Sequence, residues 1–335
     1  MECAQPACSV GLAEVEATIH SVLAGSDQLV QDYVREVAQG VGKRLRPQLL
    51  ILFADLCGTP DAHRVRYAAA CCELLHTVSL IHDDVIDEAE TRRGLRTLNT
   101  NHGNEIAVIV GDYILALAFE ELTRLRDFTM LELTMAASKQ LGLGVIQEVR
   151  HRERLNLTAA EYFEVLGLKT GSLFGLVCEG GAYLGGAGEA GRAQAREFGH
   201  CFGLGFQVVD DLLDLTLTEE EAGKPTFNDL KEGRITLPLL FAAEIDSART
   251  SELVAEFRRK PSAGAAARVR NWLADCGALR SAHEQASAWF DRAQAQLHQL
   301  VPACSHPELA ESVCGIINQV LAQVPKWVLA KRGCE

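Results

Sequence analysis

The chain has 335 residues, of which 48% are hydrophobic and 23% are charged. This composition is typical of a globular protein and excludes a disordered chain, a collagen-like repeat and a fibrous coiled coil. The net charge of -13 argues against a broad surface for nucleic acid or anionic lipid, so we expect no nucleic-acid partner. Any anionic ligand must be held by a local group of basic side chains.

The N-terminal segment contains no Lys or Arg before Arg35, so it lacks the features of a signal or transit peptide. The longest apolar stretch, residues 106–119, contains Asp112 and is too short to span a bilayer. The 11 cysteines are scattered and never spaced as CxxC, which disfavours a disulfide framework or a structural zinc site. These features predict a reduced, cytoplasmic protein without a transmembrane segment.

Residues 61–224 contain no proline, and glycines alternate there with runs rich in Ala, Leu and Glu. Such a stretch favours long helices joined by glycine turns, and no sustained alternation of β-branched residues indicates strands. The predicted fold class is all-α, with one helical domain over residues 1–335. Two glycine-rich segments, residues 180–191 and 223–233, are predicted to connect helices.

The first unusual segment, residues 73–88, carries several acidic side chains on a predicted helix. At about 100° per residue, His76, Asp83 and Asp87 fall within about 40° of one another. Stacked carboxylates cost a few tenths of a kcal/mol in a bare helix unless cations lie between them. Oxygen ligands at this spacing suit Mg²⁺, whereas a solvated acidic face is the alternative that one such cluster leaves open.

The same Asp-Asp-x-x-Asp pattern recurs at Asp210, Asp211 and Asp214, again in a predicted helix. Two metal-loaded carboxylate faces around one cavity can grip and neutralise a polyphosphate. Arginine and lysine side chains that match phosphate oxygens are available at Lys43, Arg44, Arg46, Arg92, Arg93, Lys169 and Lys224. Together, the acidic and basic groups predict two diphosphate sites, one bridged by metal and one held by basic side chains.

Three common motifs are absent from the sequence: a P-loop, a Gly-x-Gly-x-x-Gly after a predicted strand, and His-Glu-x-x-His. Kinase, dehydrogenase and metalloprotease functions therefore lose their main support.

The order of the motifs over residues 42–238 resembles the trans-isoprenyl diphosphate synthase family, the polyprenyl synthetases that include octaprenyl diphosphate synthases. The matching elements are Gly42 to Pro47, His76 to Asp87 with Arg92-Arg93-Gly94, Gly111-Asp112, Lys169-Thr170, Gln207 with the second aspartate cluster, and Gly223 to Pro238. The resemblance implies the isoprenoid synthase fold, a single bundle of long helices around a central cavity, usually as a homodimer.

The resemblance also implies roles for individual residues. Metal ligands for Mg²⁺, with three ions when substrate is bound, would be Asp83, Asp84, Asp87, Asp210 and Asp214. The catalytic residues would be Asp83, Asp87, Asp210, Lys169, Thr170 and Gln207. Isopentenyl diphosphate would be bound by Lys43, Arg46, His76 and Arg93. The allylic diphosphate would be bound by Arg92 and Lys224 together with Lys169. Arg234, also counted as substrate-binding, keeps a basic charge that is usual in the family.

The sequence departs from the family in residues 142–147, where the usual glutamate is missing and Gln147 remains. Product length in this family depends on residues before the first aspartate, here Val78 and Ser79, with Leu75 one turn further. None of these is aromatic, which favours a medium- or long-chain all-trans polyprenyl diphosphate. The alternatives are a short-chain geranylgeranyl or farnesyl diphosphate synthase, a terpene cyclase, and a non-catalytic subunit of a heteromeric synthase.

Overall fold

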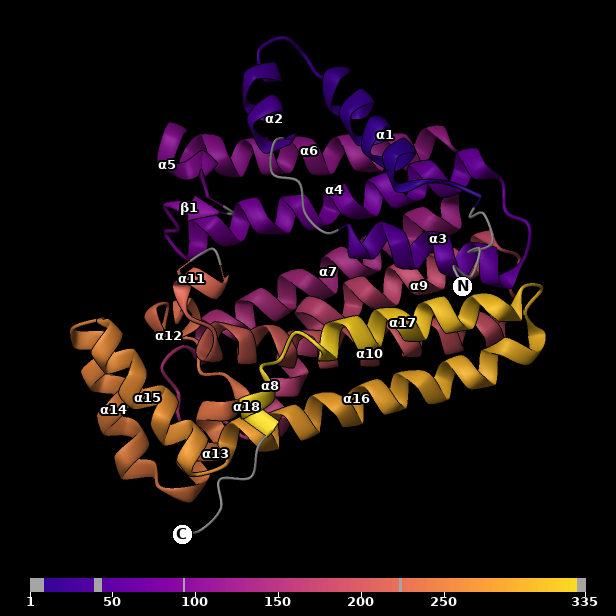
Figure 1. The fold of residues 1–335 in the computed structure, drawn as a ribbon. Helices are drawn as coiled ribbons and strands as arrows, with labels where there is room; N and C mark the ends of the chain where they lie inside the picture. Colours follow the sequence, from indigo (N-terminus) through magenta and orange to yellow (C-terminus); the bar gives the residue numbers. More distant parts are fainter. Residues whose placement is uncertain (1–8, 39–43, 93, 223–224, 330–335) are drawn as a thin grey trace. The chain divides into compact units, whose positions relative to one another are not determined.

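A computed structural model describes residues 9–38, 44–92, 94–222 and 225–329 (Figure 1). Helices dominate its regular structure, and the predicted all-α class is confirmed. The chain divides into two compact units: Met1–Lys139, Leu173–Gly199 and Gln296–Val313 form the first, and Gln140–Ser172, His200–Ala295 and Cys314–Glu335 the second. The single domain over residues 1–335 stays a prediction.

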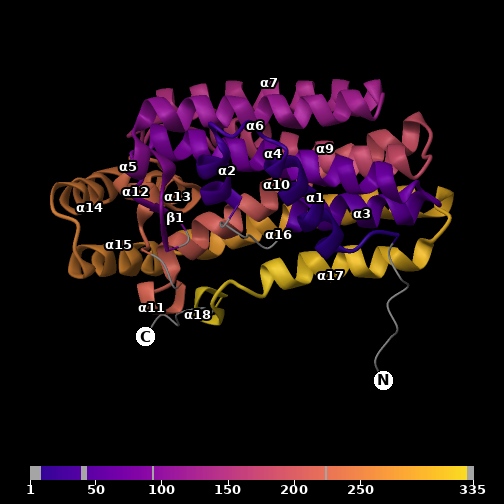
Figure 2. The ribbon, with the colours of Figure 1, turned by 90° about the horizontal axis from the view of Figure 1, so that it is seen from above.

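The first unit is built on two long helices that lie side by side, α4 (Ala62–Ile86) and α6 (Asn104–Arg124) (Figures 1 and 2). Helix α4 begins after Asp61, whose carboxylate accepts bonds from the backbone N–H groups of His63 and Arg64. The shorter helices of this unit contact these two or one another: α1 (Leu12–Ala24), α2 (Gln31–Ala38), α3 (Leu45–Cys57) and α5 (Leu98–His102).

A small antiparallel ribbon follows α4, with strands β1 (Thr91–Arg92) and β2 (Leu95–Arg96). Its pairs are Thr91 with Arg96 and Arg92 with Leu95, and Gly94 at the turn has a φ of 78°. A positive φ suits glycine, which lacks a Cβ atom. Strands of two residues are too short to produce a periodic sequence signal, which explains why the sequence did not indicate them.

Four long helices contribute residues to both units: α7 (Phe128–His151), α10 (Glu189–Thr216), α16 (Ala278–Leu300) and α17 (Ala310–Leu321). Helix α9 (Ser172–Leu184) lies in the first unit apart from Ser172, as do the 3₁₀ turns η2 (Val301–Ala303) and η3 (Pro307–Leu309). Helix α10 contains 28 residues and α7 contains 24, which agrees with the long helices predicted for the proline-free stretch.

In the second unit, α8 (Ala159–Leu166) continues directly into a π-helical turn, η1 (Gly167–Gly171). Helix α8 starts with a reciprocal capping box, in which the Thr158 hydroxyl accepts from the Glu161 N–H and the Glu161 carboxylate accepts from the Thr158 N–H. The remaining helices are α11 (Glu219–Ala222), α12 (Asn228–Lys231), α13 (Leu237–Ile245), α14 (Ser247–Arg259), α15 (Ala263–Asp275) and α18 (Lys326–Leu329).

Residues 180–191 are not one connection between helices, so that prediction was wrong. Gly181 lies inside α9, and a Cβ atom on it would come within 2.3 Å of the Leu50 carbonyl oxygen in α3. A Cβ atom on Gly185, just after α9, would come equally close, 2.3 Å, to the Ala54 carbonyl oxygen. Glycine therefore allows α9 and α3 to pack backbone to backbone. In residues 225–233 the described chain is a connection that contains the short helix α12.

The described cysteines are free thiols, and five of the eight are buried. The buried ones are Cys57, Cys71, Cys72, Cys178 and Cys201. Within the described ranges, no helix is long and apolar enough to cross a membrane.

Candidate active site

The first aspartate cluster lies at the C-terminal end of α4. Helix α4 ends at Ile86, and the Asp87 N–H still donates to the Asp83 carbonyl at 2.8 Å, which continues the helical turn. Asp83 and Asp87 therefore lie one turn apart on one face, as the sequence predicted. Both are partly exposed, and so is His76 two turns earlier on the same face.

Asp84 is turned away from that face and forms an ion pair with the ribbon. Its Oδ1 accepts a bond of 2.7 Å from Nε of Arg92 in β1, and the Asp84 side chain is only 9% exposed. Burial raises the pKa of Asp84 above its ordinary value, and the Arg92 guanidinium acts in the opposite direction. Asp84 thus anchors Arg92 beside the end of α4, while its role as a metal ligand stays a prediction.

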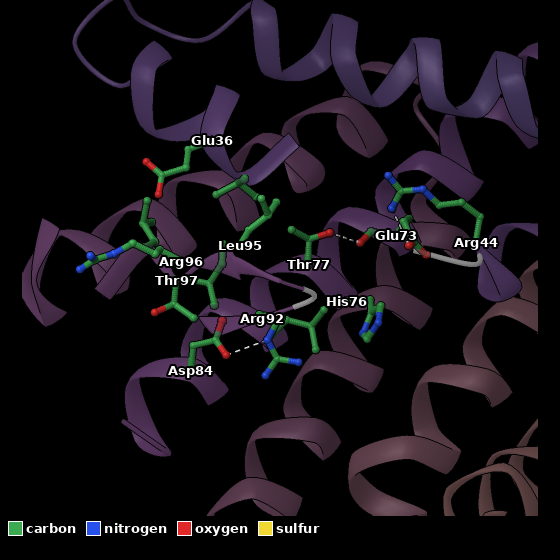
Figure 3. A pocket seen from close by; sticks show the side chains of 14 residues that line it. Glu36, Arg44, Glu73, His76, Thr77, Asp84, Arg92, Leu95, Arg96 and Thr97 are labelled. Atoms are coloured by element: carbon green, nitrogen blue, oxygen red, sulfur yellow. Dashed lines mark hydrogen bonds and ion pairs between the residues drawn. The ribbon is translucent and has the colours of Figure 1, made fainter. Parts of the chain in front are cut away.

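A pocket of about 720 Å³, including its open mouth, lies between α2, α4 and the ribbon, all in the first unit (Figure 3). His76 and Arg92 line it, as two of the predicted substrate-binding residues. Arg44 and Arg96 line it as well; sequence reasoning included Arg44 only as part of a basic motif and did not single out Arg96. The pocket also contains three carboxylates, and its apolar wall includes Leu80, Ile81, Leu95 and Leu98.

Arg46 lies in the first turn of α3. Its guanidinium carbon is 4.5 Å from the ring centroid of Phe174, a fully buried residue of α9. Stacking on an aromatic face fixes the guanidinium plane without consuming all its donors. Three other predicted substrate-binding residues, Lys43, Arg93 and Lys224, lie outside the described residues.

The second aspartate cluster lies on α10 in the second unit, and its three members have different surroundings. Asp210 is exposed, whereas Asp211 is buried and Asp214 is partly exposed. The Asp214 carboxylate accepts bonds from the backbone N–H groups of Asn228 at 3.1 Å and Asp229 at 3.3 Å, the first turn of α12. Asp214 therefore fastens α12 to α10, and its predicted role as a metal ligand stays a prediction.

Asp211 is the centre of a buried hydrogen-bond chain. The Tyr162 hydroxyl in α8 donates to Asp211 Oδ2 at 2.6 Å, and the Gln207 amide donates to Asp211 Oδ1 at 3.0 Å. The Thr170 hydroxyl in η1 in turn donates to the Gln207 carbonyl oxygen at 3.1 Å. Burial raises the pKa of Asp211 well above its ordinary value, and the nearby Asp229 adds to this effect. The chain fixes which way the Gln207 amide points, and sequence reasoning missed Tyr162.

Lys169 occupies the π-turn and forms an ion pair with α7. Its Nζ is 2.7 Å from Glu148 Oε2, with both side chains 19% exposed. Gly144, one turn earlier in α7, allows the approach, because a Cβ atom there would be 2.8 Å from the Lys169 backbone nitrogen. Lys169 thus has an acidic partner in Glu148, the residue directly after the segment 142–147 in which the sequence lacks the usual glutamate.

Arg234 forms ion pairs within its own connection. Its Nε donates to Asp229 Oδ1 at 2.9 Å, and its terminal nitrogen pairs with Glu232. These bonds stabilise the segment around α12. The role of Arg234 in substrate binding stays a prediction.

The three residues predicted to set product length differ in their positions on α4. Ser79 is 40° from Asp83 by helical periodicity, and its hydroxyl donates to the His76 carbonyl at 2.7 Å. Val78 is only 4% exposed and lies one turn before His82, whose ring would be 2.4 Å from a Cβ atom on Gly111 of α6. Val78 and the buried Leu75 therefore lie nearer the α6 side, and Ser79 nearer the aspartate side.

Among the residues that the structure describes, no three His, Cys, Asp or Glu side chains gather closely enough to hold a metal ion by themselves. Asp83 and Asp87 nevertheless supply carboxylate oxygens one turn apart, the donor type that Mg²⁺ prefers. Mg²⁺ commonly keeps waters and completes its shell with substrate phosphates. The donor set fits Mg²⁺ bound together with a diphosphate.

An all-α chain with two Asp-Asp-x-x-Asp helices and basic side chains beside them is characteristic of enzymes that transfer prenyl groups between diphosphates. The chain belongs to the family described as polyprenyl synthetase, whose model matches residues 27–273, and it is therefore a prenyltransferase.

Characterised relatives share much of its length. An all-trans-nonaprenyl-diphosphate synthase (geranyl-diphosphate specific) from Rhodobacter capsulatus is 33% identical over 284 residues, which cover 84% of this chain and 86% of the relative. Heptaprenyl diphosphate synthase component 2 from Bacillus subtilis is 35% identical over 229 residues, 68% of this chain and 64% of the relative. The crystal structure of a decaprenyl diphosphate synthase from Rhodobacter capsulatus matches with a TM-score of 0.84 and 28% identity, covering 94% of this chain and 96% of the other.

Proposed function

We propose that the protein condenses isopentenyl diphosphate with an allylic diphosphate and releases a medium- or long-chain all-trans polyprenyl diphosphate. The observation that carries the proposal is the carboxylate face of Asp83 and Asp87 at the end of α4, beside a pocket lined by His76 and Arg92. The family match supports this chain length, as do the names of the relatives: a nonaprenyl and a decaprenyl diphosphate synthase, and one component of a heptaprenyl diphosphate synthase.

Mg²⁺ is the proposed cofactor, with three ions when substrate is bound. Asp83 and Asp87 would hold two ions and Asp210 the third, with Asp84 and Asp214 as further candidate ligands. When bound, Mg²⁺ supplies positive charge that stabilises the departing diphosphate of the allylic substrate.

The chain's own basic residues would bind and orient the two diphosphates. Arg92, held at its Nε by Asp84, would contact the allylic diphosphate together with Lys169 and Lys224. Isopentenyl diphosphate would be bound by Lys43, Arg46, His76 and Arg93, and Arg234 would add positive charge nearby. Contacts that strengthen as negative charge builds on the leaving group lower the barrier selectively.

The reaction would start with cleavage of the allylic C–O bond, in which the electron pair leaves with the diphosphate. The double bond of isopentenyl diphosphate then attacks the allylic cation, and the resulting cation loses a proton to the departed diphosphate. No protein base is required. The oxygens of Thr170 and Gln207, oriented through Asp211, would stabilise the cation as dipoles without forming a bond to it.

A homodimer is the proposed assembly. Helix α6 exposes two neighbouring apolar side chains, Val108 at 40% and Ile109 at 61%, and contiguous exposed apolar surface can mark a protein interface. A second copy would bury them. Sedimentation equilibrium of the wild type and of Ile109→Glu would test this proposal, and a wild-type monomer at micromolar concentration would overturn it.

A reducing compartment such as the cytoplasm is proposed from the free, buried cysteines.

Mass analysis of the products tests the proposed reaction. Purified protein would be incubated with Mg²⁺, isopentenyl diphosphate and one allylic starter at a time, from dimethylallyl to geranylgeranyl diphosphate. The expected product is longer than geranylgeranyl diphosphate. A product no longer than geranylgeranyl would establish the short-chain alternative, and hydrocarbon or alcohol from an allylic diphosphate alone would establish a cyclase. Turnover that appears only after a second chain is added would establish a subunit of a heteromeric enzyme.

A further inference from the structure

Arg44 connects three segments of the first unit through its guanidinium group. Its Nε and Nη2 donate to the two oxygens of Glu16 in α1, at 2.7 and 2.9 Å, and its Nη1 donates to Glu73 in α4 at 2.7 Å. The Arg44 and Glu73 side chains are 12% and 6% exposed, so the bonds lie largely out of water. A two-point arginine–carboxylate bond fixes orientation as well as distance.

The backbone of Arg44 is unusual in the same place. Its φ of 50° and ψ of 35° lie in the left-handed region, which residues with a Cβ atom rarely adopt. Helix α3 begins at the next residue, Leu45, and the Arg44 carbonyl accepts the Gln48 N–H at 3.1 Å. A strained conformation persists only where the surrounding contacts determine it, and here the bonds to Glu16 and Glu73 are those contacts.

Two of the predicted isopentenyl diphosphate ligands lie close in sequence to Arg44 or to its partner Glu73. Arg46 follows two residues later in the first turn of α3, where its guanidinium stacks on the Phe174 ring. His76 lies one turn after Glu73 on α4, and it lines the same pocket as Arg44 and Glu73 (Figure 3). The ion pairs therefore tie the start of α3, which carries Arg46, to the turn of α4 that leads to His76.

We propose that Arg44 is a positioning residue for isopentenyl diphosphate, acting through Glu73 and Glu16 to hold Arg46 and His76 at the spacing that one diphosphate requires. This inference rests on the proposed function and adds three residues to it. Misplacing a positioned group by about 1 Å can cost up to about 100-fold in rate, so small shifts of α3 have measurable effects.

A purely structural role would have a different signature. Removing one partner of a buried ion pair leaves the other charge uncompensated and lowers stability wherever the pair lies. A positioning role additionally weakens the binding of one substrate and leaves the other unaffected. The measurements must therefore separate stability from the affinities of the two substrates.

The chain offers a matched control in Glu179 of α9. Its side chain is also 6% exposed, and it bonds to Arg192 at 3.1 Å and Arg196 at 3.3 Å, all within the first unit. Glu73→Gln and Glu179→Gln thus remove the same charge from equally buried, arginine-paired sites. Urea unfolding would measure the stability of both variants, and calorimetric titration with isopentenyl diphosphate alone would measure its binding without turnover.

We expect Glu73→Gln to raise the Kd and the KM for isopentenyl diphosphate on the order of tenfold, with kcat and the allylic KM changed less than about twofold. Glu179→Gln should lower stability without changing either KM. Glu16→Gln, at a side chain 24% exposed, provides a milder variant in case Glu73→Gln unfolds, and it should shift the same Kd in the same direction. Arg44→Lys should retain more affinity for isopentenyl diphosphate than Arg44→Gln, because lysine keeps the positive charge although it cannot bind a carboxylate at two points as arginine does.

Folded Glu73→Gln and Glu16→Gln proteins with wild-type affinity for isopentenyl diphosphate would overturn the inference. An equal shift in Glu179→Gln would overturn it too, since a general loss of stability would then account for the effect. Wild-type protein that neither binds nor consumes isopentenyl diphosphate would overturn the proposed function itself, a result distinct from the first two.

Discussion

Gly144 in α7 offers a sharp test of how the π-turn is held in place. A Cβ atom on Gly144 would lie 2.8 Å from the Lys169 backbone nitrogen and 3.0 Å from Leu168 Cβ, so Gly144→Ala requires α7 and η1 to separate. Gly142 lies two residues earlier in α7, and a Cβ atom there would meet nothing within 4 Å. The two glycines are therefore a matched pair on one helix, one against the backbone of η1 and one in open space.

The expected difference follows from this geometry. Replacing glycine by alanine inside a helix gains about 1 kcal/mol at either position, so this gain cancels when the variants are compared. Inserting a methyl group into a closely packed contact typically costs about 1–3 kcal/mol, and only Gly144→Ala incurs this cost. Gly142→Ala should therefore be more stable than Gly144→Ala by about 1–3 kcal/mol.

Urea unfolding followed by circular dichroism measures this difference, and steady-state kinetics report its effect on the site. Because Lys169 moves with η1, Gly144→Ala should lower kcat/KM on the order of tenfold, while Gly142→Ala should keep wild-type activity. Two variants of equal stability and equal activity would refute the reasoning, since the close contact would then have no energetic consequence.

Four further predictions address the proposed site and the stability of the fold. Asp83→Ala and Asp210→Ala should lower turnover by orders of magnitude while the urea midpoint stays within error; near-wild-type turnover at saturating Mg²⁺ would remove these ligands from the proposal. Arg46→Ala should raise the KM for isopentenyl diphosphate, because a charge-assisted contact contributes about 1.5–3 kcal/mol, and an effect on the allylic KM alone would mean that the sites are exchanged. Ser79→Tyr should shorten the products seen by mass analysis without abolishing turnover, and an unchanged distribution would place the cavity floor elsewhere. Burial lowers the pKa of His283 below its ordinary value of 6.5, so the unfolded chain binds more protons than the folded one near this pH. The free energy of unfolding should therefore fall as the pH drops through and below 6.5. In urea titrations between pH 5 and 8, His283→Gln should reduce this dependence of the free energy of unfolding on pH, and an equal dependence in both proteins would contradict the assignment.

Helical periodicity was sufficient to place side chains that share a face of one element. It correctly put Asp83 and Asp87 together on α4, and the proline-free stretch correctly indicated long helices. Periodicity describes a single helix, so it carried no information about the partners that one helix finds on another. The bond from Arg92 to Asp84 and the bond from Tyr162 to Asp211 join segments whose pairing depends on the fold.

The structural role of glycine was the feature that the sequence predicted least well. In a linear pattern it suggested a break between helices, because glycine costs a helix about 1 kcal/mol relative to alanine. Gly181 and Gly144 instead lie inside helices at points where a backbone atom of another segment would be only 2.3 and 2.8 Å from an added Cβ atom. That use of glycine depends on a neighbour distant in the chain, which a local pattern does not contain.

The π-turn at Gly167–Gly171 determines how the side chains before it and after it are rotated relative to each other about the helix axis. In an uninterrupted α-helix, Tyr162 and Thr170 are eight residues apart and would point about 80° away from each other. A π-turn accommodates one extra residue, so Thr170 takes the phase of a position seven residues on, about 20° from Tyr162. Both hydroxyls then reach α10, at Asp211 and at Gln207, which are four residues apart on that helix. Deleting one residue between Tyr162 and Thr170 would leave Thr170 seven residues on in an ordinary α-helix, and so in the same phase. Converting the turn to an α-helix at unchanged length would instead rotate Thr170 by about 100°, away from Gln207.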